Sequence, residues 1–300
     1  YHGHVGLESL SSSLDLMDAA ELRAYSQKNS FTPNANDDKG ANTNWMEAIQ
    51  KETAFSHNHN ISFSGGTDKS SYSASLNYLK KDGIILQSDL ERVVGRISVE
   101  HHAVNDRVTF GLNLMSSNSK SSNVPLQNMV FQQAVKFNPM SPVYNADGTY
   151  FENFNNPGYF NPVSIIKNAA DDTKYGSLQG NFTVEAKLPF NLTYNLNLAY
   201  QRGTWLHGEY YNSYYSQNYS TGNFYTNGDP GGGRSLRNFY SNGLAYRGYY
   251  QSSSKTMESY LTWAKKLGWH NVKAVAGYSW QKNTNNDGLQ SSQTNFVNDY

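Results

Sequence analysis

Hydrophobic and polar residues alternate along this chain in segments of about ten residues. In each clear segment, one set of alternate positions holds Val, Leu, Ile, Phe and Tyr, and the other set holds mainly Ser, Asn, Thr, Gly and Gln. Successive side chains of a strand point to opposite faces, so this alternation predicts β-strands with one apolar and one polar face. The predicted strands lie at 1–10, 71–79, 92–101, 108–114, 178–188, 192–200 and 272–280, with weaker examples at 57–65 and 257–266.

The connections between these strands alternate strictly between short and long. Short connections of a few residues separate some neighbours, whereas long connections occupy 11–56, 81–91, 117–174 and 201–255. Outer-membrane barrels have this arrangement, with tight turns at one end and long loops at the other. Most loops of compact soluble domains have only about 4–6 residues. The spacing therefore favours a transmembrane barrel over a soluble β-sandwich.

The predicted fold class is all-β, a partial transmembrane antiparallel β-barrel with a short helix in its first long loop. The helix is expected at 15–29, after a Ser-rich stretch that can supply an N-cap, and a second short turn at 44–52. Bacterial single-chain barrels close with an even number of strands, whereas nine strands are predicted here. We therefore expect residues 1–300 to be a fragment of a larger barrel.

The composition supports a β-rich membrane protein and excludes several other classes. The chain has 24 basic and 24 acidic side chains, a balance that argues against a nucleic-acid surface. Its 23 Tyr, 14 Phe and 5 Trp argue against disorder. It has no Cys, which excludes disulfides, thiolate metal sites and cysteine nucleophiles. No apolar stretch approaches the ~18–20 residues of a membrane-spanning helix, but hydropathy misses membrane strands.

Several motifs resemble one family. The motifs are LDLMDAAELRAY at 14–25, NTNW at 42–45, FSHNHNISFSGG at 55–66, SYSASLNYLKKD at 71–82, ERVVGR at 91–96 and HNVKAVAGY at 270–278. Together they resemble the SusC/RagA-type TonB-dependent outer-membrane transporters. The resemblance runs through most of the chain, although the two longest loops match no recognisable pattern.

The resemblance implies a 22-strand barrel with an N-terminal plug, driven by the TonB complex and covered by a SusD-like surface lipoprotein. It implies active import of an oligosaccharide or peptide across the outer membrane of a Gram-negative cell. Residues 1–300 would be one piece of the barrel domain, without the plug, the TonB-contacting region and the C-terminal strands. Such a protein contacts outer-membrane lipid, makes or breaks no bond and needs no cofactor, so we expect no enzyme activity and no catalytic residues.

Three sets of residues invite a metal or phosphate interpretation, and each is weak. The pairs His2/His4 and His57/His59 each place two imidazoles on one strand face, but no third ligand has suitable spacing. The segment 34–40 resembles a calcium loop in composition only, because Lys39 and Trp45 occupy the positions where an EF-hand needs Gly and Glu. The Gly-rich run 229–234 lacks the Lys-Ser/Thr of a phosphate loop. We predict no metal site.

Aromatic residues crowd the long connection 201–255 and are the candidate contact residues for a ligand or partner. Their flat faces and polar edges suit stacking on sugar rings or binding a partner protein. Packing of the loop against itself is the competing explanation. The candidates are Trp205, Tyr210, Tyr211, Tyr214, Tyr215, Tyr219 and Tyr225.

Two other functional classes stay open from the sequence. The chain could be a surface glycan-binding β-rich module without transport activity, which high salt rather than detergent would release. It could also be an outer-membrane enzyme on a small barrel, which would require a Ser–His pair or paired carboxylates converging at one rim. No nucleophile-elbow motif or other catalytic triad is recognisable.

Overall fold

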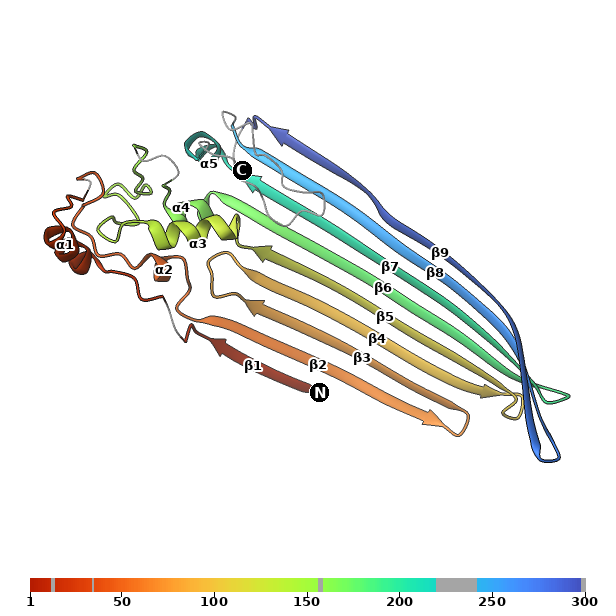
Figure 1. Ribbon diagram of the computed structural model, residues 1–300. Helices are drawn as coiled ribbons and strands as arrows, with labels where there is room; N and C mark the ends of the chain where they lie inside the picture. Colours follow the sequence, from red (N-terminus) through yellow and green to blue (C-terminus); the bar gives the residue numbers. More distant parts are fainter. Residues whose placement is uncertain (12–13, 34, 156–158, 220–241, 298–300) are drawn as a thin grey trace.

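The computed structural model describes residues 1–11, 14–33, 35–155, 159–219 and 242–297. Within these residues, nine strands form one sheet in which every strand pairs antiparallel with the next in sequence (Figure 1). This confirms the predicted all-β antiparallel fold. The strands are β1 (His2–Glu8), β2 (Ala54–Thr67), β3 (Ser70–Asp82), β4 (Asp89–Ala103), β5 (Val108–Asn123), β6 (Ala169–Leu188), β7 (Leu192–Tyr211), β8 (Leu244–Leu267) and β9 (His270–Thr294).

Tight hairpins join the strands at one end of the sheet, and the helices gather at the other end (Figure 1). The β6–β7 turn places Phe190 and Asn191 at φ +64° and +61°, and the β8–β9 turn places Gly268 at φ +60°. Left-handed residues suit two-strand turns because they match the twist of the flanking strands. Phe190 and Trp269 are 85% and 100% exposed at these turns. Exposed aromatic side chains at this end are typical of a membrane–water interface.

Most strands are longer than the sequence predicts, mainly at the end away from the hairpins, whereas β1 is shorter than the predicted 1–10. β5 continues to Asn123, β7 to Tyr211 and β9 to Thr294, so the predicted loops 117–174 and 201–255 begin and end inside strands. Alternation is lost in these extensions, because polar or aromatic residues occupy both faces there. The backbone hydrogen bonds nevertheless continue, as the register of β5 with β6 and β8 with β9 shows.

Five helices lie in the described part of the chain: α1 (Ala19–Lys28), α2 (Trp45–Ala48), α3 (Gln127–Lys136), α4 (Pro162–Lys167) and α5 (Ser213–Asn218). The first predicted helix is confirmed but begins later. Its N-cap is Asp18, which accepts from the Glu21 backbone at 2.8 Å in a capping box, and not the Ser-rich stretch. α3, α4 and α5 were not predicted. None of these helices has the length and apolar character needed to cross a bilayer.

The hydrophobic core lies among the helices and loops rather than on the sheet. It joins three connections far apart in sequence, those that follow β1, β5 and β7. The indole of Trp45 lies 4.5 Å from the ring of Phe137, and its Nε1 donates to the Asn138 carbonyl at 2.9 Å. Phe137 in turn stacks on Tyr159 at 4.2 Å. We call the buried residues of these three connections the loop core, and the nine-stranded sheet the wall. Trp45 gives the NTNW motif a structural role in the loop core, at one end of the wall.

Candidate functional site

One face of the sheet is apolar and carries the larger hydrophobic side chains. Directly paired residues share a face, so cross-strand registers can be followed as rows. One such row runs from Tyr72 to Trp280 through Val99, Leu112, Phe182, Leu198 and Met257. No second sheet covers this face in the described residues, and Ile97 in the next row is 48% exposed. We call it the apolar face; a continuous exposed apolar band of this kind marks a lipid or protein contact.

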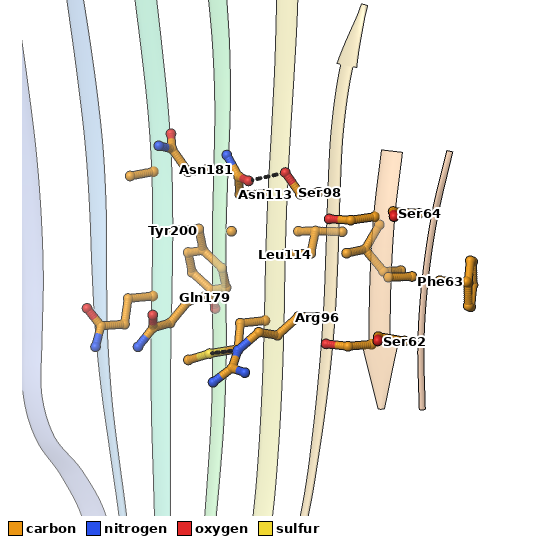
Figure 2. Close-up of a pocket in the computed structure, with 18 of the residues that line it drawn as sticks. Ser62, Phe63, Ser64, Arg96, Ser98, Asn113, Leu114, Gln179, Asn181 and Tyr200 are labelled. Atoms are coloured by element: carbon orange, nitrogen blue, oxygen red, sulfur yellow. Dashed lines mark hydrogen bonds between the residues drawn. The ribbon is translucent and has the colours of Figure 1, made fainter. Parts of the chain in front are cut away.

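The opposite face, here called the polar face, carries mainly neutral polar residues. Its rows alternate with the apolar rows. One runs Ser64, Ser73, Ser98, Asn113, Asn181, Ala199 and Thr256, and another runs Ser62, Ser75, Arg96, Met115, Gln179, Gln201 and Ser254. These two rows, with the row between them that holds Phe63, Leu114 and Tyr200, line a hollow of about 780 Å³ near the middle of the sheet (Figure 2).

The hollow offers hydrogen-bonding groups with one formal positive charge. Ser98 Oγ donates to Asn113 Oδ1 at 2.7 Å, and Arg96 Nε lies 3.4 Å from the Met115 sulfur (Figure 2). The Arg96 guanidinium forms no ion pair with any described residue. Asn181 Oδ1 is buried and accepts no hydrogen bond from the described residues. The hollow can therefore bind hydroxyl or amide groups. None of its described lining residues is a carboxylate that could take part in bond cleavage.

Aromatic side chains continue the polar face toward the loop core. Trp205 lies 5.2 Å from Tyr250 and 5.2 Å from His207, measured between ring centroids. His207 also meets the ring of Tyr246 edge-on at 6.0 Å. Trp205 and Tyr250 are half-buried, so part of each ring stays available to a ligand. The predicted residue Trp205 thus joins Tyr250, which was not among the candidates.

The other aromatic candidates divide among different environments. Tyr211, Tyr215 and Tyr219 are fully buried in the loop core. Tyr214 is half-buried beside Tyr150 and Tyr219. Tyr210 belongs to the apolar face, opposite Ala245, and lies 5.7 Å from Phe296. Tyr225 lies outside the described residues. Packing of the loop against itself therefore accounts for the three fully buried tyrosines in this chain, and ligand contact by the set stays a prediction.

A histidine and two carboxylates come together on the polar face beside Trp205. His207 Nε2 lies 3.0 Å from Asp171 and 3.6 Å from Glu209, and the three ligand atoms lie within 4.8 Å of one another. This set could hold a cation, and sequence spacing did not reveal it because Asp171 is on another strand. Asn123 donates to Asp171 at 2.8 Å and Tyr211 to Glu209 at 3.0 Å. These contacts give both carboxylates protein partners.

The two histidine pairs that invited a metal interpretation lie apart, although His57 and His59 contact each other, with His59 Nε2 3.1 Å from His57 Nδ1. His2 and His4 lie on the polar face, whereas His57 and His59 lie on the apolar face, as their register with Asn60 and Tyr78 shows. In the calcium-like segment, Asp38 pairs with Arg23 at 2.8 Å. Asp37 is buried and accepts from Asn153 at 2.7 Å. Asn34 and the Gly-rich run 229–234 lie outside the described residues.

Glu152 is the most perturbed carboxyl group of the loop core. Burial raises the pKa of Glu152 to about 7, against the smaller lowering effect of hydrogen bonds from the Tyr219 hydroxyl and the Asn161 backbone. The protonated side chain is therefore favoured in the folded core. Its stabilising contribution is full below the ordinary pKa of about 4.5 and is lost as the pH rises through about 7.

We expect the loop core to open more readily at pH 8 than at pH 5. The shift corresponds to a loss of about 1–3 kcal/mol in the free energy of opening. Hydrogen exchange at the amides of α4, compared at the two pH values after correction for intrinsic rates, measures it. Glu152→Gln should abolish most of the difference. An equal difference in wild type and variant would assign the pH dependence to another group.

Comparisons with known proteins place these faces in context. No family model matches the chain. It is 28% identical over 302 residues to the TonB-dependent receptor P3 of Formosa agariphila, covering 97% of this chain and 27% of that receptor. It is 25% identical over 211 residues to the TonB-dependent receptor SusC of Bacteroides thetaiotaomicron, covering 63% of this chain and 21% of that receptor. The chain thus spans about a quarter of the length of these relatives.

Solved structures show the same fold. The RagAB peptide importer in its closed-closed state superposes with a TM-score of 0.69 at 16% identity, over 99% of this chain and 36% of that chain. The open-open state gives a TM-score of 0.70. At this identity the likeness concerns the fold alone. All these relatives are named as receptors or importers, which agrees with the expectation that the chain is not an enzyme.

Proposed function

We propose that this chain, which belongs with the SusC/RagA-type TonB-dependent receptors, forms part of the barrel wall of an active nutrient importer in the outer membrane. The observation that supports this most directly is the division of one uncovered sheet into an apolar and a polar face. In a membrane barrel, lipid contacts the first face and water the second. Residues 1–300 would then be consecutive strands of a single barrel domain, which other parts of the full-length protein complete.

The polar face favours a neutral oligosaccharide as the imported molecule, with a peptide as the second candidate. The hollow carries hydroxyl and amide groups with a single guanidinium, that of Arg96, and the half-buried rings of Trp205 and Tyr250 lie farther along the same face. The hydroxyl groups of a sugar can hydrogen-bond to the polar residues of the hollow, and its ring can stack on Trp205 and Tyr250. The name of one structural relative, a peptide importer, supports the alternative.

The loop core is where a lid protein would sit. It lies at the end of the wall opposite the tight hairpins (Figure 1). We propose that this end faces the cell exterior and meets a SusD-like lipoprotein, and that TonB drives transport through a plug supplied by the full-length protein. Co-purification of the lid with full-length protein tests this arrangement.

Replacing Trp205 tests the function and the substrate class together. In the full-length receptor, Trp205→Ala should weaken binding of a neutral oligosaccharide by about 10- to 30-fold, because truncating a buried aromatic contact costs about 2 kcal/mol. Titration calorimetry with matched oligosaccharides and peptides measures the effect. Tyr249→Ala is the control, since Tyr249 lies next to Tyr250 but on the apolar face.

Three outcomes would count against parts of this proposal. Binding of peptides alone would replace the oligosaccharide as substrate. Equal losses in Trp205→Ala and Tyr249→Ala would remove the aromatic contact from the site. Release of the native protein from membranes by high salt without detergent would overturn the barrel itself and favour a surface module.

A further inference from the structure

Basic side chains interrupt the apolar face at one level, beyond the apolar rows. Lys255 of β8 pairs directly with Lys282 of β9, and both are exposed on the apolar face. Arg202 lies on the same face of β7, two residues after Tyr200. We call Arg202, Lys255 and Lys282 the basic cluster. It spans three adjacent strands immediately beyond Tyr200, Met257 and Trp280.

The height of the basic cluster matches the edge of a bilayer. A membrane strand needs about 9–11 tilted residues to cross the hydrocarbon region. Lys255 lies twelve residues before the end of β8 at Leu267, and Lys282 twelve residues after the start of β9 at His270. The hairpin end carries exposed Trp269, as an interface does. Lys255 and Lys282 therefore emerge from lipid at the level of the headgroups on the loop-core side.

No ion pair among the described residues neutralises this charge. Two like charges directly opposite on neighbouring strands destabilise a sheet. None of the three side chains forms an ion pair with a described residue. Arg202 donates to Gln251 at 2.7 Å, which holds its guanidinium on the apolar face. Three cations above an apolar band thus lack a carboxylate partner among the described residues.

A second lysine pair repeats the arrangement three strands away. Lys120 of β5 pairs directly with Lys174 of β6, again on the apolar face and exposed. Here acids lie close in the register, because Glu91 pairs with Lys120 on its other side and Asp172 is the next residue of this face along β6. On the face of the basic cluster, one acid lies close in the register, Asp287, which pairs with Gln251, so three cations face one carboxylate. The β5–β6 pair lies farther toward the loop core, because Lys174 pairs with Leu206 whereas Lys255 pairs with Tyr200.

We propose that the basic cluster binds the phosphorylated headgroup of an outer-leaflet lipid. Phosphate oxygens accept from guanidinium and ammonium groups, and the acyl chains of the same molecule would cover the apolar row below. The aliphatic stems of Lys255 and Lys282 cross the apolar boundary while their ammonium groups reach the phosphates. This inference rests on the membrane orientation in the proposed function but not on the substrate.

The test compares lipid binding by full-length protein in neutral detergent. The probes are fluorescent lipid A and the same lipid after removal of its phosphates. The triple variant Arg202→Gln/Lys255→Gln/Lys282→Gln should bind lipid A at least 10-fold more weakly than wild type. Lys265→Gln is the matched control, because Lys265 lies on the same face near the hairpin end, opposite Val272. It should bind like wild type.

Each further outcome has a defined meaning. Equal binding of the dephosphorylated lipid by wild type would overturn the proposal, and so would displacement of lipid A by millimolar inorganic phosphate, which would identify a free-anion site. An unchanged affinity in the triple variant would also overturn it. Heat-modifiable gel mobility confirms that each variant is folded. Substrate binding is measured in parallel, so failure of the import proposal is recognised separately from failure of the lipid site.

Discussion

Leu196→Arg should destabilise the membrane-inserted protein by about 2–4 kcal/mol, the cost of a cationic side chain near the bilayer midplane on the lipid face of a barrel. Leu196 lies on the apolar face, between Val184 of β6 and Ser259 of β8. It lies four residues from the hairpin-end start of β7 at Leu192, within the span that crosses the hydrocarbon. Urea-induced unfolding of the full-length protein from lipid vesicles measures the change in the free energy of unfolding.

Asn195→Arg is the matched control for this experiment. Asn195 is the neighbouring residue on the polar face, where Glu185 of β6 lies directly opposite. An arginine there meets water and a carboxylate, so we expect a change within about 1 kcal/mol. Equal destabilisation by both substitutions would mean that the two faces have similar surroundings. Greater tolerance at Leu196 would show that the apolar face does not meet lipid.

The sequence predicts the strands well where lipid is proposed to meet one face. From Leu192 to Tyr200, apolar and polar residues alternate because each face has one kind of neighbour, and the predicted strand agrees with the first part of β7. Beyond Tyr200, hydrophobic side chains are no longer needed on the apolar face. Residues 281–294 are polar on both faces apart from Leu289, yet they complete β9 through backbone pairing with β8. Periodicity alone cannot reveal a strand whose two faces have similar surroundings.

Among the helices of the loop core, α3 was hard to predict for a different reason, whereas α4 and α5 have Asn N-caps that the sequence analysis missed. α3 begins after Leu126, which has φ +48° and provides no side-chain cap, so its start carries none of the usual signals. Its position depends on packing with segments far away in sequence, such as the contact between Phe137 and Trp45. α1, by contrast, has a local capping box and was recognised.

The candidate site was predicted by composition, but its geometry required the fold. Aromatic residues after 201 were visible in the sequence, whereas their sorting between the polar face and the loop core was not. Counting positions along β7 would have assigned Trp205 and His207 to the polar face, since they continue the register of Asn195 and Asn197. The burial of Tyr219 depends on Phe160, which belongs to a separate connection and whose ring lies 4.8 Å from the ring of Tyr219.

The largest single effect is expected from Tyr215→Ala in the full-length protein. Tyr215 is 0% exposed, and its ring lies 4.9 Å from Tyr211 and 5.0 Å from Tyr219. Removing a buried aromatic ring costs about 3–5 kcal/mol through lost burial and the cavity left behind. Because the strands have their own backbone hydrogen bonds, the loss should fall on the loop core while the wall stays folded.

Hydrogen exchange and limited proteolysis distinguish local from global loss. In Tyr215→Ala, amides of α4 and α5 should exchange faster by at least 100-fold, whereas amides of β6 below Leu178 on the hairpin side should keep their protection. Tyr214→Ala, in the same helix but at a half-buried position, should change exchange by less than about 10-fold, in line with a cost near 1 kcal/mol. Similar effects of the two substitutions would show that Tyr215 does not anchor the core. Loss of protection along β6 would instead mean that the loop core and the wall fold as one cooperative unit.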